Sequence, residues 1–173
     1  MPQAPSQCLP SGDGYLRARL SGAIAAELNW KNDELECVGA IRPTDGGIRM
    51  RFSPSGTHAN EKIVLVFGIA QLAEGTAARS VPVNLTVIRE GKGEFYSTQG
   101  DDKCMLDEVR QTPLVGIPFK SRSYRIVARG YCTEPARAVR GQGAVLLSRF
   151  DFAGRVDFES TDASEDEPLM ATQ

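Results

Sequence analysis

The sequence predicts an all-β protein: an antiparallel β-sandwich of about ten strands, braced by disulfides. Apolar residues alternate with polar ones through most of the chain, as in strands with one face in water. Turn-forming residues separate these runs at short intervals, and four cysteines are spread over the 173 residues. A closed β-barrel is the alternative arrangement of the same strands.

The first four predicted strands show the clearest alternation. They cover residues 15–20, 24–30, 35–41 and 48–52. Every second residue in them, such as Leu16, Trp30 and Phe52, is apolar and is expected to face the core. Residues 31–33 have the sequence Lys-Asn-Asp and predict a hairpin turn between the second and third strands.

The remaining strands alternate less regularly. Residues 63–69 are apolar almost throughout, which predicts a central strand buried on both faces. Further strands are expected at 81–88, 94–97, 124–131, 144–152 and 155–158. We interpret residues 100–108 as an acidic loop between strands. No run approaches the roughly 20 apolar residues that a transmembrane helix needs, so no transmembrane segment is expected.

The chain predicts one domain, residues 15–158, between an extended amino-terminal segment, 1–14, and an acidic tail, 159–173. The tail has five acidic residues and no lysine or arginine, a composition typical of disorder. The formal net charge is −2, and without the tail 17 acidic residues face 20 basic ones, about +3. This balance argues against a general nucleic-acid-binding protein.

Four cysteines allow three disulfide pairings. We expect Cys8–Cys37 and Cys104–Cys132, because these pairs close loops of similar length, 29 and 28 residues apart in sequence. In the chain-entropy model each would stabilise the fold by about 3–4 kcal/mol. A zinc site, which usually has close CxxC pairs, and four free thiols are the alternatives. Disulfides favour a periplasmic or secreted protein.

The amino end lacks the basic region and apolar stretch of a signal peptide. It reads like the start of a mature protein with an added methionine. We therefore expect the native precursor to carry a leader or a lipoprotein anchor ahead of this segment.

Arginine rows form the candidate binding surface. The four residues occupy outward positions of two predicted strands: Arg17, Arg19, Arg49 and Arg51. If these strands share one sheet, the arginines make a basic face for an acidic protein or an anionic glycan. The alternative is a solvated face whose arginines pair with neighbouring glutamates, Glu27, Glu34 and Glu36.

The densest group of acidic residues in the body is the candidate metal site. Asp101, Asp102, Asp107 and Glu108 provide the hard oxygen ligands that Ca²⁺ prefers. Their spacing does not fit an EF-hand. The alternative is a solvated turn held in place by Cys104.

No catalytic residue is predicted, and no cofactor is expected. His58 is the single histidine, and GxSxG, GxGxxG and GxxxxGK[ST] motifs are absent from the sequence. The sequence favours an exported, non-enzymatic binding or interaction protein of the bacterial envelope, such as an inhibitor or immunity-type protein. The alternatives are a polysaccharide or cell-wall hydrolase with two catalytic carboxylates and a structural subunit of an envelope assembly. The partner and the oligomeric state are left open.

Overall fold

A computed structural model describes residues 8–42, 46–114 and 122–158. Within these ranges it contains eleven strands, three short 3-10 helices and no α-helix. The strands are β1 (Tyr15–Gly22), β2 (Ala26–Lys31), β3 (Leu35–Ile41), β4 (Ile48–Pro54), β5 (Ile63–Ile69), β6 (Ala78–Arg89), β7 (Glu94–Ser97), β8 (Cys104–Pro113), β9 (Ser123–Cys132), β10 (Ala136–Ala138) and β11 (Ala144–Asp157). The 3-10 helices are η1 (Asn32–Glu34), η2 (Gly56–Glu61) and η3 (Glu90–Lys92). The predicted acidic tail and residues 1–7 of the predicted amino-terminal segment lie outside the described residues.

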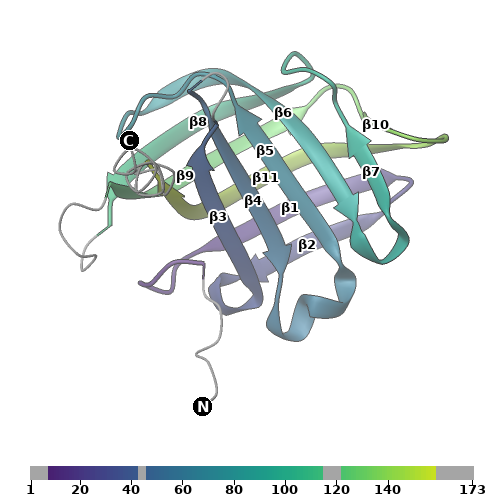
Figure 1. The fold of residues 1–173 in the computed structure, drawn as a ribbon, viewed down its shortest axis with the longest axis horizontal. Helices are drawn as coiled ribbons and strands as arrows, with labels where there is room; N and C mark the ends of the chain where they lie inside the picture. Colours follow the sequence, from purple (N-terminus) through teal and green to yellow (C-terminus); the bar gives the residue numbers. More distant parts are fainter. Residues whose placement is uncertain (1–7, 43–45, 115–121, 159–173) are drawn as a thin grey trace, which may run out of the picture.

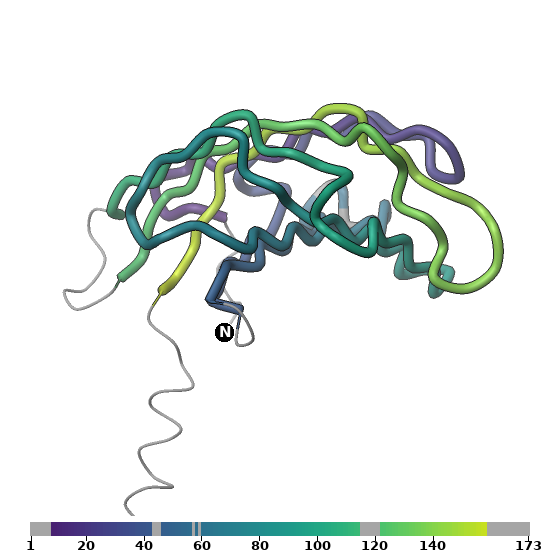
Figure 2. The backbone as a smooth tube through the Cα atoms, turned by 90° about the horizontal axis from the view of Figure 1, so that it is seen from above, coloured from purple at the N-terminus to yellow at the C-terminus, as the bar shows by residue number. Residues whose placement is uncertain are grey.

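The strands form two layers whose strands cross steeply (Figure 1). The front layer contains β3 to β7, and the back layer contains β1, β2, β9 and β11. Seen from above, purple β1 and β2 run with yellow-green β11 along one side, opposite blue β4 (Figure 2). The pairing order is β10-β7-β6-β5-β4-β3-β11-β1-β2, with β8 pairing β6 and β9, and β9 pairing β11. The predicted all-β, antiparallel fold is therefore confirmed.

Strand β11 joins the two layers. It pairs antiparallel with β1, β9 and β10, and it meets β3 in a parallel bridge, Asp157↔Ala40. On the other side of the molecule β8 pairs with β6 of the front layer and with β9 of the back layer. Strand pairing therefore connects the two layers there as well. Because the layers are connected on both sides, the sheet combines features of the sandwich and of the barrel.

Two glycines allow β3 and β4 to approach β11 closely. A Cβ atom on Gly39 would lie 2.7 Å from the Arg155 carbonyl oxygen and 2.4 Å from the Met50 sulfur. A Cβ on Gly154 would lie 3.1 Å from Met50 and 3.2 Å from Phe52. Larger side chains at these positions would push the layers apart.

The buried apolar residues form one core between the layers. Four phenylalanines lie at its centre, from β4, β5 and β11: Phe52, Phe67, Phe150 and Phe152. Their nearest ring centroids lie 4.7 Å apart, for Phe67 and Phe150, a distance typical of favourable aromatic contacts. The predicted central strand is confirmed, because six of the seven residues of β5 are buried.

Both predicted disulfides are present, so the zinc and free-thiol alternatives are wrong. The Cα atoms of Cys8 and Cys37 lie 4.8 Å apart, and those of Cys104 and Cys132 lie 3.9 Å apart. All four cysteines are used in these two bonds. The first disulfide fixes the start of the described chain to β3, and the second links directly opposed residues of β8 and β9.

The buried side chain of Asn32 holds the segment before β1. Its Oδ1 accepts hydrogen bonds from the backbone N–H groups of Leu9 and Gly14, both at 2.8 Å. Its Nδ2 donates to the Leu9 carbonyl at 3.0 Å. Asn32 also accepts the N–H of Cys8 at its own carbonyl, at 3.2 Å. One amide side chain therefore satisfies three buried backbone groups.

Three predicted local features are wrong. The 31–33 segment is not a hairpin turn, because β2 pairs with β1 and β3 pairs with β4; η1 instead carries the chain from one layer to the other. Residues 104–108 are not loop but the start of β8, and β11 is one strand where two were expected. With β8 and the short β10 added, the strands number eleven.

We predict that Asn32→Ala lowers the free energy of unfolding by about 2–4 kcal/mol, because it leaves buried backbone groups without hydrogen-bond partners. Urea unfolding with both disulfides intact measures the change. Asn60→Ala, at an exposed position, is the control and should stay within about 0.5 kcal/mol of the native protein. Equal unfolding midpoints for Asn32→Ala and the control would contradict the role of Asn32.

Candidate functional site

The structure divides the predicted arginine rows between the two layers. Arg17 and Arg19 lie on the outer face of β1 in the back layer, and Arg49 and Arg51 lie on β4 in the front layer (Figure 1). The four side chains therefore do not share one face. Only Arg17 and Arg19 border a groove among the three that the described part of the chain shows most clearly.

This groove, which we call the arginine groove, has a volume of about 470 Å³. It crosses the outer face of the back layer. Its charged lining comes from five strands: Arg17 and Arg19 of β1, Glu27 of β2, Asp107 of β8, Arg129 of β9, and Arg149 and Asp151 of β11. Sequence reasoning missed Arg129 and Arg149, because only the pairing of β9 and β11 brings them beside β1.

Most charged groups in the arginine groove already pair with each other. Arg17 contacts Asp151 at 3.0 Å, and Arg19 contacts Glu27 at 3.3 Å. Arg149 and Asp107 are exposed and make no ion pair with any residue that the structure describes. The groove thus retains one cation and one anion without an internal partner.

Arg149 lies directly opposite Arg19 in the pairing of β1 with β11. Both side chains are exposed, and directly opposed residues point to the same face of a sheet. Like charges in this position repel each other, and Glu27 offsets the charge of Arg19 but leaves Arg149 without an ion-pair partner among the described residues.

A β-bulge produces this position. The partner of Arg19 is Arg149, but the partner of Leu20 is Leu147, so Ser148 is an additional residue in β11. On the other side, the pairing of β11 with β9 begins only at Phe150↔Gly130. Arg149 therefore lies where β9 separates from β11, and the arginine groove opens there.

A second groove, of about 410 Å³, adjoins the first. The two share Arg129 and Asp151. The second adds Arg110, Arg125 and Glu108 as charged groups. Together the grooves contain six arginines and four carboxylates, so this face has a modest excess of positive charge.

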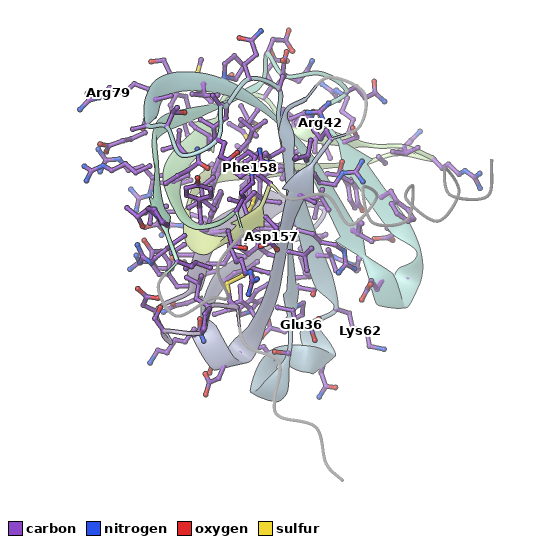
Figure 3. All side chains as sticks on the ribbon, turned by 60° about the vertical axis from the view of Figure 1, so that its left-hand side comes forward. Glu36, Arg42, Lys62, Arg79, Asp157 and Phe158 are labelled. Carbon is purple, nitrogen blue, oxygen red and sulfur yellow. A yellow bond between two sulfur atoms is a disulfide. The ribbon has the colours of Figure 1, made fainter. Side chains whose placement is uncertain are left out.

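Glu108 lines the second groove. It contacts Arg110 at 3.0 Å and Arg129 at 3.4 Å. The hydrogen bond from Arg110 lowers the pKa of Glu108, and Arg129 and Arg79 add weaker attraction. Arg79 extends from the surface at the start of β6 (Figure 3). Glu108 is therefore ionised over a wide pH range and holds two arginines in position.

Two other carboxyl groups have lowered pKa values. A hydrogen bond from Ser11 is the main cause at Asp13, and one from Arg122 is the main cause at Glu74. The pKa values of Asp13, Glu74 and Glu108 thus all move downward. Such carboxylates remain charged and form ion pairs, whereas a general acid needs a raised pKa.

The structure does not gather the four candidate calcium ligands. Asp101 and Asp102 lie in the turn before β8, and Asp102 contacts Lys103 at 3.3 Å. Asp107 borders the arginine groove, while Glu108 is paired with arginines. In the parts of the chain that the structure describes, no three His, Cys, Asp or Glu side chains are placed to hold a metal ion. Calcium binding stays a prediction from the sequence.

The single histidine belongs to a structural cluster at the end of the sheet near η1 and η2. The Nε2 of His58 lies 3.4 Å from Oε1 of Glu34, and its Nδ1 contacts Oε2 of Glu61. Trp30 is fully buried and donates its Nε1–H to Glu61 at 3.0 Å. These contacts connect η2 to β2.

Comparison of the chain with protein-family models, with curated proteins and with solved structures gives no match. Among the described residues there is no helix of the length and apolarity that crossing a bilayer requires.

We predict that Arg110→Gln raises the pKa of Glu108, because it removes the main hydrogen bond to the carboxylate. Carboxyl ¹³C NMR titration measures this shift. The folded pKa lies below the unfolded value of about 4.3, so the interaction stabilises the fold above that pH. This contribution is lost as the pH falls through the folded pKa. Arg137→Gln, at an exposed arginine of β10, is the control; equal Glu108 titrations in the two variants would refute the assignment.

Proposed function

We propose that the protein is an exported, non-enzymatic binding protein that recognises a carboxylate-bearing protein partner through the arginine groove. Arg149, with Arg19 opposite it, receives the partner's carboxylate. An inhibitor or immunity-type protein is the most specific form of this proposal.

The opposed pair Arg19 and Arg149 carries the proposal. Glu27 offsets only the charge of Arg19, so an anion that contacts both arginines relieves the remaining repulsion and adds to the binding free energy. Arginine also suits this role, because its planar guanidinium donates two parallel hydrogen bonds to a carboxylate.

The mixture of charges favours a protein partner over a glycan. Asp107 lines the groove and makes no ion pair with any described residue, whereas Glu27 and Asp151 are each paired with an arginine. A uniformly anionic glycan would be repelled at Asp107, whereas a protein surface can place a lysine or arginine against it. Complementary charges of both signs give specificity at protein–protein interfaces.

Two observations support binding rather than hydrolysis. A polysaccharide hydrolase needs one carboxyl group with a raised pKa as proton donor, but the pKa values of Asp13, Glu74 and Glu108 are lowered. In addition, Asp151 and Glu27 of the arginine groove each contact an arginine. Their charges are used to position cations.

The two disulfides support the exported location. Both are formed between buried cysteines, and stable structural disulfides are typical of the periplasm and the extracellular space.

We predict that Arg149→Glu weakens binding of a glutamate-rich peptide about tenfold, or ~1.4 kcal/mol, because it replaces attraction by repulsion. ¹H–¹⁵N NMR titration measures the affinity and locates the peptide. In the native protein the shifts should centre on residues 17–19, 129 and 149, and they should weaken as salt increases.

Arg49→Glu is the matched control, because Arg49 is also an exposed strand arginine but lies on β4. It should leave peptide binding unchanged. Equal losses in both variants, or shifts spread over both layers, would contradict the proposal. A parallel titration with a heparin oligosaccharide separates the two kinds of partner, since stronger binding of heparin at the same residues would favour an anionic glycan.

A further inference from the structure

Among the strands that the structure describes, β2 leaves one edge of the sheet free. It stands at the end of the pairing order, and among the described strands it pairs with β1 alone. Its six residues, Ala26–Lys31, contain no proline and no bulge in their pairing with β1. Proline and bulges are common devices that prevent an edge strand from pairing with another chain.

The backbone groups that point away from β1 follow from the alternation of hydrogen bonds along a strand. Just before β1, the Gly14 N–H points to Asn32 at the end of β2; just after it, the Ala23 N–H points to Ala144 beside β11. Even-numbered residues of β1 therefore hydrogen-bond to β2, and their partners in β2 are also even-numbered. The odd-numbered residues of β2 must point to the free edge.

Lys31 provides an independent check. Its backbone N–H donates to the side chain of Glu34, which follows β2 in the chain, at 2.9 Å and not to β1. The N–H and C=O groups of Glu27 and Asn29 share this direction. These backbone groups face outward at the edge of the sheet, where they can hydrogen-bond to a further antiparallel strand.

The side chains of β2 are complementary to those of a second β2. If two antiparallel copies are centred on Asn29, Glu27 of one chain opposes Lys31 of the other, and Asn29 opposes Asn29. On the inner face Leu28 opposes Trp30. Glu27 and Asn29 carry outward side chains and supply free backbone groups in this register. The Lys31 N–H joins the ladder by exchanging the Glu34 carboxylate for the Glu27 carbonyl of the second copy.

We propose that β2 is the contact edge of a two-fold symmetric dimer of this chain, with Asn29 at the symmetry axis. Other two-fold registers oppose like charges: one centred on Glu27 brings the two Glu27 side chains together, and one centred on Lys31 brings the two lysines together. Oppositely charged cross-strand pairs stabilise a sheet, and like-charged pairs destabilise it. The order of charges along β2 thus favours a second copy of β2 as the pairing strand and also specifies the register of the pairing.

The dimer joins the two copies of the arginine groove. Each groove reaches β2, where Glu27, Leu28 and Asn29 form its border. Across the two-fold axis these borders meet, and the outer faces of the two back layers become one surface. The dimer itself does not depend on the proposed function of the groove.

A charge-exchange series tests the dimer by sedimentation velocity of the full chain over a range of concentrations. The native chain should approach twice the monomer mass. Glu27→Lys and Lys31→Glu should each raise the dissociation constant at least about tenfold, because each opposes like charges twice across the axis. The double variant should dimerise like the native chain. An equimolar mixture of the two single variants should form heterodimers, since both cross-strand pairs are then oppositely charged.

Glu36→Lys is the control for net charge, because Glu36 is exposed on β3 in the front layer (Figure 3). It should dimerise like the native chain. A native chain that stays monomeric at the highest concentration, or single variants that dimerise as tightly as the control, would overturn the proposal. A double variant that remains monomeric would overturn the register. Thermal unfolding of each variant confirms that it is folded.

Discussion

The continuity of β11 is the constraint on which the rest of the structure depends. This strand forms ladders with β1, β9 and β10 and a bridge with β3, so it must present apolar side chains to the core along its whole length. The bulge at Ser148 and Arg149 makes this possible. Leu147 before it and Phe150 after it both face inward, although they are three positions apart. Without the bulge, one half of β11 would place its apolar residues in solvent.

The same bulge determines the chemistry of the outer face. An additional residue in β11 shifts its pairing with β1, so Arg149 becomes the partner of Arg19. In β8, a second register shift lies between Leu106 and Glu108 and leaves Asp107 exposed at the arginine groove. In the arginine groove, the two charged groups without an ion-pair partner among the described residues, Arg149 and Asp107, thus both lie at bulges. A core that needs continuous apolar faces has, as a consequence, two irregular positions on its surface that are available for recognition.

These bulges also explain which features could be predicted from the sequence. Strands with strict alternation, such as β1 and β4, were predicted correctly, and loop lengths suggested the right cysteine pairs. In β8 the buried positions are Cys104, Leu106, Val109 and Gln111, so the period of two is interrupted at the bulge and the strand resembles a loop. The arginine groove could not be predicted, because it depends on pairings between strands far apart in sequence. No local pattern shows that Arg19 and Arg149 are neighbours.

The Cys104–Cys132 disulfide has a role in this arrangement that loop closure alone does not explain. It joins directly opposed residues on one side of the β8 bulge, while Val109↔Ala128 continues the ladder on the other side. The register of a strand pair changes when a bulge leaves the strand at its end, and the covalent bond prevents this at the Cys104 end of β8. The bond therefore helps to keep Asp107 at the groove and Glu108 beside Arg110 and Arg129. The buried disulfide, the bulge and the ion pairs together fix the position of each charge that the proposed partner meets.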